Sequence, residues 1–275
     1  MNKSDTASSA DFPSVMRYEE IPPPDQLRAA VASLWRFNVD RHDPPSFDHT
    51  IPPDGCVNLA VVRAAGSIER IAVVGPRLSA LRVPVRRGVE YFGLRARPEA
   101  GRVVTGGPPS RIRERVTPID LLDGTRARAI EAHLANARSV DSVLDGLAKA
   151  VAEWLVEAPP IDSLVSRMIE RLVGAHGQVA VGRLAEGFGV GYRQGLRRFH
   201  SAVGLSPKEF ARLARLRHAC LVALEPRGTT WATVSADAGF SDQAHMNREF
   251  SDVFGWPPRL VREYLRRIEH VGVAS

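Results

Sequence analysis

The feature that most constrains the fold is a helical pattern that occurs twice in the last third of the chain. In the first copy, residues 181–203, small and apolar residues precede Gly189 and a second helical stretch begins at Tyr192. The second copy, residues 229–253, has Gly239 at the corresponding turn. Glycine suits such a turn because it adopts positive φ without a steric penalty. Each copy therefore predicts two short helices held at a fixed angle, which is the geometry of a helix-turn-helix unit.

Each unit contains apolar residues at helical spacing. The first helices carry Leu184, Ala185 and Phe188 in one unit and Trp231, Val234, Ser235 and Ala238 in the other. The second helices carry the stripes Leu196, Phe199, Val203 and Met246, Phe250, Val253. At about 100° per residue, the positions opposite these stripes and on their flanks are Arg193, Gln194, Arg197, Arg198, Ser201 and Gln243, Ala244, His245, Asn247, Arg248, Ser251. A helix with polar groups over its first two turns fits the major groove of DNA.

The predicted DNA-binding residues are Arg193, Gln194, Arg197, Arg198, Gln243, His245, Asn247 and Arg248. A guanidinium pairs bidentately with guanine N7 and O6, so Arg197 and Arg248 are the candidates for base contacts. The amides of Gln194, Gln243 and Asn247 suit adenine. For each residue, a phosphate contact or plain solvation stays an open alternative. The other arginines of the region are expected to contact phosphates or solvent, namely Arg212, Arg215, Arg262, Arg266 and Arg267.

A capped helix is predicted between the two units. Ser206 and Glu209 form a capping-box sequence, with Pro207 at the first helical position. The region is also basic, because residues 159–275 hold 16 Lys and Arg against 11 Asp and Glu, a net of +5 out of +6 for the whole chain. A basic region favours a polyanionic partner, although a solvated basic surface is an alternative explanation.

The N-terminal part has a different pattern, in which Pro and Gly separate short apolar segments rich in Val, Ile, Leu and aromatic residues. These segments are 32–37, 57–62, 71–74, 81–85 and 90–95. Residues 81–85 alternate with period two, and Gly75-Pro76 is one of several turn signals. The pattern predicts a small antiparallel β domain.

Helical spacing resumes from Pro118 to Glu157, and Ala158-Pro159-Pro160 then breaks the chain before Asp162, a candidate helix cap. The predicted fold class is α+β, with a β-rich N-terminal domain, a helical connector, and an all-α C-terminal domain with two helix-turn-helix units. The predicted segments are a disordered lead-in over 1–16, the β-rich domain over 17–117, the connector over 118–158 and the C-terminal domain over 159–270.

Several classes of site find no support in the sequence. No Ser-His-Asp arrangement, spaced carboxylate pair or phosphate loop stands out, so we expect no catalytic residue, no cofactor and no enzyme. His49, Asp54 and Cys56 lie close in sequence, but no second His follows at the H-x-H spacing, and core or turn roles are favoured over a metal site.

Membrane and secretory segments are not expected either. No stretch approaches the roughly 18 uncharged apolar residues of a membrane span, and the first fifteen residues lack the apolar core of a secretory signal. Cys56 and Cys220 lie in dissimilar settings and are expected to be reduced, buried thiols of a cytosolic protein.

The C-terminal region resembles the DNA-binding module of the AraC/XylS family over about residues 162–268. The likeness lies in GLSPKEFARLARLRHACLVAL and ADAGFSDQAHMNREFSDVFGWPP, most specifically in residues 239–245 with Phe250, Phe254-Gly255 and Pro258. The chain departs from the family pattern at Gly195, where a large apolar residue is usual, and at Leu196, where a polar one is usual. A glycine inside a helix costs about 1 kcal/mol relative to alanine.

The N-terminal region resembles the cupin-like sensor domain of one AraC subgroup, through residues 52–59, 74–76 and 92–98. This resemblance implies that the β-rich domain binds a small-molecule effector or mediates dimerisation. Together the two resemblances imply a bacterial transcription regulator, cytoplasmic and nucleoid-associated. Its implied partners are double-stranded DNA, an effector, a second copy of the chain and, for an activator, RNA polymerase, with no membrane.

The alternative is a small-molecule-binding or enzymatic cupin-like protein whose helical half is an interaction domain. The outward Arg, Gln and Asn side chains on both recognition helices favour the regulator, because acidic or apolar residues would be expected there in an interaction domain.

Overall fold

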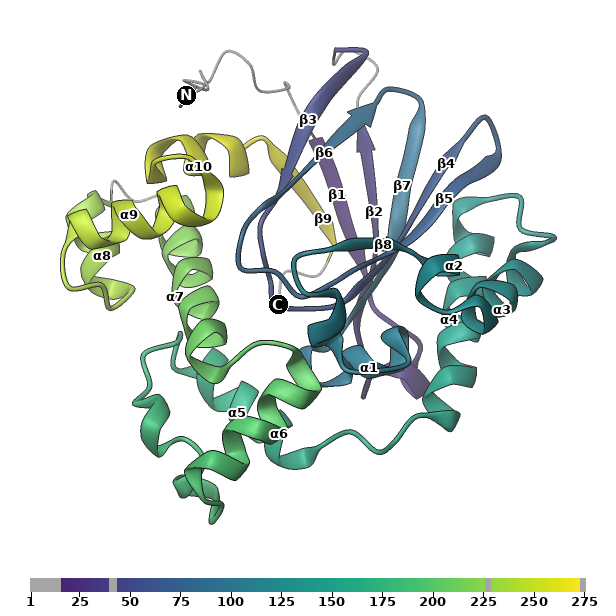
Figure 1. Ribbon diagram of the computed structural model, residues 1–275. Helices are drawn as coiled ribbons and strands as arrows, with labels where there is room; N and C mark the ends of the chain where they lie inside the picture. Colours follow the sequence, from purple (N-terminus) through teal and green to yellow (C-terminus); the bar gives the residue numbers. More distant parts are fainter. Residues whose placement is uncertain (1–15, 40–43, 226–228, 273–275) are drawn as a thin grey trace, which may run out of the picture.

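The chain folds around one β-sheet that has helices on both of its faces (Figure 1). The computed structural model describes residues 16–39, 44–225 and 229–272. The lead-in expected over residues 1–16 lies outside the described residues, apart from Met16, which begins the first strand and is buried.

The strands are β1 (Met16–Ile21), β2 (Val31–Val39), β3 (Ser46–Ile51), β4 (Asn58–Ala64), β5 (Ser67–Val74), β6 (Leu81–Arg86), β7 (Val89–Ala96), β8 (Val116–Pro118) and β9 (Ile268–Gly272). Seven of them form a sheet in the order β8-β5-β4-β7-β2-β1-β9, and β3 pairs with β6. All five segments predicted as strands are confirmed. β1 and β3 were not predicted because charged and polar residues interrupt their apolar ones, as in Phe47-Asp48-His49-Thr50-Ile51.

The helices are α1 (Gly101–Thr105), α2 (Ile119–Leu122), α3 (Gly124–Leu134), α4 (Val140–Glu157), α5 (Ser163–Gly174), α6 (Tyr192–Val203), α7 (Pro207–Leu224), α8 (Trp231–Asp237), α9 (Gln243–Phe254) and α10 (Pro258–Leu265). The Asp162 cap is confirmed, since its carboxylate accepts from the backbone N–H of Leu164 at 3.0 Å. The Ser206–Glu209 capping box is confirmed at the start of α7. Among the helices of the described residues, none is long and apolar enough to cross a membrane.

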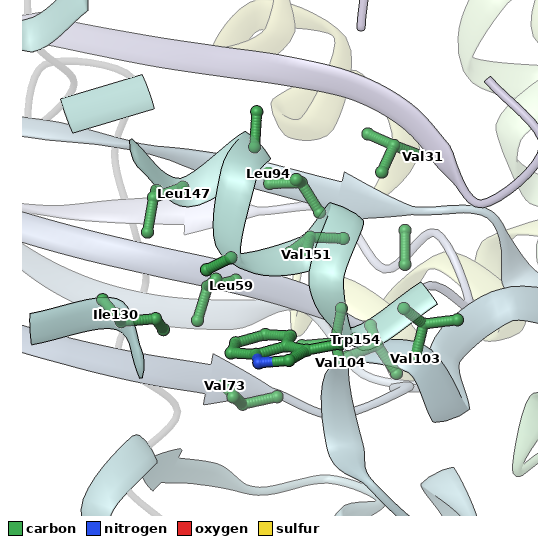
Figure 2. Packing of buried hydrophobic residues seen from close by; sticks show 14 of the residues in the cluster. Val31, Leu59, Val73, Leu94, Val103, Val104, Ile130, Leu147, Val151 and Trp154 are labelled. Carbon is green, nitrogen blue, oxygen red and sulfur yellow. The ribbon is translucent and has the colours of Figure 1, made fainter. Parts of the chain in front are cut away.

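The connector helix α4 covers one face of the sheet. Its buried side chains Leu147, Val151 and Trp154 pack on Leu59 and Leu94 of the central strands, as Figure 2 shows. These residues recur at three- and four-residue steps, which places them on one side of a helix. The helical prediction for the connector is therefore confirmed, and α4 completes the core on this face.

Helices of the C-terminal region cover the opposite face. Adjacent residues of a strand point to opposite sides, so Leu34 of β2 faces α4, whereas Trp35 and Phe37 join a second apolar cluster. That cluster contains Phe250 of α9 and Tyr264 of α10. The β-rich domain and the helical C-terminal region are confirmed, and both contribute residues to this second cluster.

The chain end adds a strand that the all-α prediction for the C-terminal domain did not include. β9 pairs in parallel with β1, from Met16 opposite Ile268 to Glu20 opposite Gly272. The last residues of the C-terminal region thus become the edge of the N-terminal sheet. The boundary predicted at residues 158–162 coincides with the extended link between α4 and α5. Division of the chain there into independent domains stays a prediction.

Candidate nucleic-acid interface

The first helix of the first helix-turn-helix unit is not an α-helix. Its place is taken by two 3-10 turns, Val181–Arg183 and Glu186–Phe188. Leu184 and Ala185 are buried as expected. Gly182 and Gly187 explain the difference, because each glycine lowers the stability of an α-helical turn by about 1 kcal/mol relative to alanine.

The second helix, α6, crosses this segment at Gly195. A Cβ built on Gly195 would lie only 2.4 Å from the Cβ of Ala185. The glycine therefore allows a closer approach of the two backbones than a side chain would permit, which accounts for the departure from the family pattern at this position. The prediction that Leu196 belongs to the buried stripe is wrong: Leu196 is half-buried, and the inward positions are Gly195, Phe199, Ala202 and Val203.

The polar residues of α6 fall into two groups. Arg193, Gln194 and Arg197 are exposed and form no hydrogen bond or ion pair with the described residues. Arg198 instead donates to both carboxylate oxygens of Asp162, at 2.7 and 2.6 Å. These hydrogen bonds hold the pKa of Asp162 below its usual range. Arg198 is thus tied to the cap of α5, a role that its outward position did not suggest.

The second unit has a regular α-helix on each side of its turn. Thr230 caps α8 by accepting from the backbone N–H of Thr233 at 3.2 Å. Gly239 forms the turn at φ 70°. Asp242 caps α9 by accepting from the backbone N–H of His245 at 2.6 Å, and this bond is the main reason that the pKa of Asp242 lies below its usual value.

The two faces of α9 agree with the sequence prediction. Met246, Phe250 and Val253 are buried. The opposite side is exposed and consists of Gln243, Ala244, Asn247, Arg248 and Ser251. In the described residues, no hydrogen bond or ion pair occupies Gln243, Asn247 or Arg248, so these three side chains are available to a partner.

His245 has a different environment from its neighbours. It is half-buried, with its ring edge-on to Phe240 at a centroid distance of 5.4 Å. Its Nδ1 lies 3.1 Å from the hydroxyl of Ser241, and its Nε2 lies 3.7 Å from Glu249. The imidazole therefore packs against residues at the start of α9, and it also lies beside the exposed side of that helix.

Most arginines expected at phosphates are used inside the domain. Arg212 of α7 forms an ion pair with Glu249 of α9. Arg215 lies over the ring of Phe240 at 5.7 Å, and Arg262 over Trp231 at 4.7 Å. Sequence reasoning missed these roles, because the aromatic and acidic partners are far away in the chain. Of the five arginines, Arg266 is the most exposed.

Helix α10, which follows the second unit, is held to strand β3 of the N-terminal domain. The hydroxyl of Tyr264 in α10 accepts from the backbone N–H of Thr50 at 2.7 Å and lies 2.6 Å from Nδ1 of His49. Burial lowers the pKa of His49 to about 4, so its ring is neutral near pH 7. His49 also stacks on Phe37, with ring centroids 4.2 Å apart.

The three residues considered for a metal do not come together. His49 is bound to Tyr264, whereas the carboxylate of Asp54 forms an ion pair with Arg95 at 3.1 Å and accepts from the backbone N–H of Cys56. Within the ranges that the structure describes, no group of three His, Cys, Asp or Glu side chains is placed to hold a metal ion. Cys56 and Cys220 are free thiols, the first buried and the second half-buried.

Two family models match the sequence. A helix-turn-helix domain matches residues 184–264, and a domain of unknown function (DUF6597) matches residues 19–118. No curated protein matches the chain.

Solved structures are also similar to the chain. A probable AraC family transcriptional regulator from Rhodopseudomonas palustris CGA009 is 24% identical, with a TM-score of 0.34 over 39% of this chain and 100% of that one. An apo variant of ToxT from Vibrio cholerae is 9% identical, with a TM-score of 0.41 over 92% and 97% of the two chains. ToxT with a bound unsaturated fatty acid is 9% identical, with a TM-score of 0.37 over 94% and 95%.

Proposed function

We propose that the chain is a DNA-binding transcription regulator of the AraC type with a further N-terminal domain, and that its second helix-turn-helix unit reads base edges in the major groove. The observation that carries this proposal is the exposed side of α9. Arg248 and Asn247 lie there on a helix whose inner side and N-terminal cap are fixed. An arginine in that position suits guanine, and an asparagine suits adenine.

We propose that α6 makes the second contact through Arg193, Gln194 and Arg197, all of them exposed. Arg198 can reach DNA only by leaving Asp162. Gln243 and His245 lie at the start of α9, where free backbone N–H groups favour a phosphate. In this proposal, α9 supplies most of the sequence discrimination and α6 adds affinity.

The N-terminal domain is proposed to respond to an effector or to pair two copies of the chain, and an activating form would contact RNA polymerase. Since DNA is its target, we place the protein in the cytoplasm at the nucleoid. The alternative, an enzymatic cupin-like protein with a helical interaction domain, leaves the free Arg, Gln and Asn side chains of α9 without a role. We therefore propose no catalytic activity.

The test is the salt dependence of DNA binding by the full chain. Binding to fragments from upstream of its own gene should weaken steeply between about 50 and 200 mM salt, because each neutralised phosphate releases counterions. A random fragment of equal length serves as the control. Binding that does not change with salt, or no binding to any genomic fragment, contradicts the proposal.

A further inference from the structure

A cleft of about 340 Å³ lies where the N-terminal domain, the inter-domain link and the first recognition helix meet. The N-terminal domain contributes the 3-10 helix Pro98–Ala100 and the start of α1, the link contributes residues 159–162, and α6 contributes the turns around Arg197 and Ser201. Pockets that bind small molecules begin at about 300 Å³. The site therefore has room for a compact metabolite.

Glu99 provides the first sign that the cleft is built for a ligand. Its side chain lines the cleft and is only 9% exposed. Its Oε2 is fully buried and has no hydrogen-bond partner. Buried polar atoms in native proteins are nearly always paired, and an unpaired one costs about 1–3 kcal/mol. A ligand with a positive charge beside the Glu99 carboxylate would offset this cost electrostatically.

Two arginines that line the same cleft provide the second indication of a ligand site. Arg102 of α1 and Arg197 of α6 are exposed, and neither forms a hydrogen bond or ion pair with a described residue. Arg198 also lines the cleft, but its guanidinium is held by Asp162. Two free guanidinium groups and a carboxylate without a partner thus line one cleft and offer both charges to one ligand. Pro159, Pro160 and Ile161 form the apolar wall of the site.

We propose that this cleft binds a small zwitterion of the amino-acid class, with its ammonium group at Glu99 and its carboxylate between Arg102 and Arg197. Guanidinium groups bind carboxylates through charge-assisted hydrogen bonds. A purely anionic ligand would leave Glu99 unpaired, and an amine without an acid would leave both arginines unpaired.

The proposal deepens the proposed function, on which its regulatory part rests. Arg197 belongs both to the cleft and to the exposed side of α6. A carboxylate bound at Arg197 removes that guanidinium from DNA and holds α6 against the N-terminal domain. Since coupling between two binding sites is reciprocal, DNA should weaken binding of the zwitterion by the same factor as the zwitterion weakens binding of DNA.

The test measures thermal unfolding of the full chain without DNA, in the presence of each of the twenty free L-amino acids at millimolar concentration. At least one should raise Tm, as any compound does that binds only the folded state. Its methyl ester, which lacks the carboxylate, and its N-acetyl form, which lacks the ammonium group, should not. No shift with any amino acid overturns the proposal, and equal shifts with either derivative overturn the assigned class.

Variants locate the site. Glu99→Gln and Arg102→Ala should each raise the Kd of the active amino acid at least about tenfold by calorimetry, the loss expected for about 1.4 kcal/mol. Arg171→Ala, an exposed arginine on α5 outside the cleft, should leave the Kd unchanged. Arg102 is exposed, so its variant keeps the test informative if Glu99→Gln unfolds. An unchanged Kd in Arg102→Ala overturns the proposed site. Failure to bind DNA, by contrast, would contradict only the proposed function.

Discussion

The two helix-turn-helix units have the same order of parts but are held together in different ways. In the second unit, two α-helices are capped by Thr230 and Asp242, and the exposed side of α9 faces solvent. In the first unit, 3-10 turns replace one helix, and Gly191, which precedes α6, has no side chain to cap it. The second unit is therefore stabilised by its own local structure, whereas the first depends more on its neighbours.

Those neighbours are parts of the N-terminal domain. A Cβ on Gly204, at the end of α6, would lie 2.8 Å from the backbone nitrogen of Ser110 and 2.9 Å from the ring of Pro76. Arg113 forms an ion pair with Glu209 at 2.8 Å, just beyond α6. Weak internal structure at a tight inter-domain contact suits an element that changes position with the state of its partner domain.

The largest effect is expected in the core of the second unit. Met246→Ala should lower the free energy of unfolding by about 2–5 kcal/mol, because Met246 is completely buried and its removal leaves a cavity. Leu196→Ala, at a half-buried position of α6, is the matched variant and should cost much less. Chemical denaturation measures both. Similar losses would show that the units do not differ in packing.

A second prediction concerns the fastening of α10 to β3. The folded pKa of His49, about 4, lies below the usual 6.5, so the folded state binds fewer protons than the unfolded state between these values. The contribution of His49 to the free energy of unfolding should be fully present above pH 6.5. It should fall by up to about 3 kcal/mol as the pH drops to 4. His49→Gln should flatten this part of the pH profile of unfolding. The exposed His200→Gln is the control, and an unchanged slope in His49→Gln would contradict the assignment.

The close contact in the first unit gives the third prediction. Gly195→Ala should destabilise the chain by about 1–2 kcal/mol, because its new methyl group collides with Ala185. This collision outweighs the gain of about 1 kcal/mol in helix propensity. The double variant Ala185→Gly/Gly195→Ala should recover most of the loss, since the methyl group is then on the other side of the contact. Thermal unfolding of the three variants tests this. If Ala185→Gly does not restore the stability lost in Gly195→Ala, the collision with Ala185 is not its cause.

The smallest effect is a gain in stability. A Cβ on Gly187 meets no atom within 4 Å. Gly187→Ala should therefore stabilise the first unit by about 0.5–1 kcal/mol, through lower backbone entropy of the unfolded chain. Gly189→Ala, at φ 73°, is the contrasting variant and should destabilise it. Equal effects of the two substitutions in thermal unfolding would contradict the account of the 3-10 turns.

Sequence reasoning succeeded where local patterns determine the structure. The periodicity of α9, the Asp162 cap and the Ser206–Glu209 capping box depend on residues a few positions apart, so the sequence alone predicts them. It failed at β1 and β3, whose polar residues are stabilised by pairing with other strands. It also placed Leu196 in the buried stripe of α6 instead of Gly195.

The candidate site shows the same division. The exposure of Asn247 and Arg248 followed from helical spacing. The ion pair of Arg198 with Asp162 did not, since the two residues are 36 positions apart. Likewise, no local signal predicts that Glu99 and Arg197 line the same cleft. Contacts between distant segments decide which arginines are free, and these contacts require the fold.

The central claim, that α9 reads DNA, is tested most directly by comparing Arg248→Ala on the specific fragment and on random DNA. We expect a loss of about 1–3 kcal/mol on the specific fragment and almost none on random DNA, with relaxed preference at one base pair. Arg266→Ala should instead weaken both alike and lower the salt slope by about one if it contacts a phosphate. Equal losses on specific and random DNA for Arg248→Ala would contradict the claim.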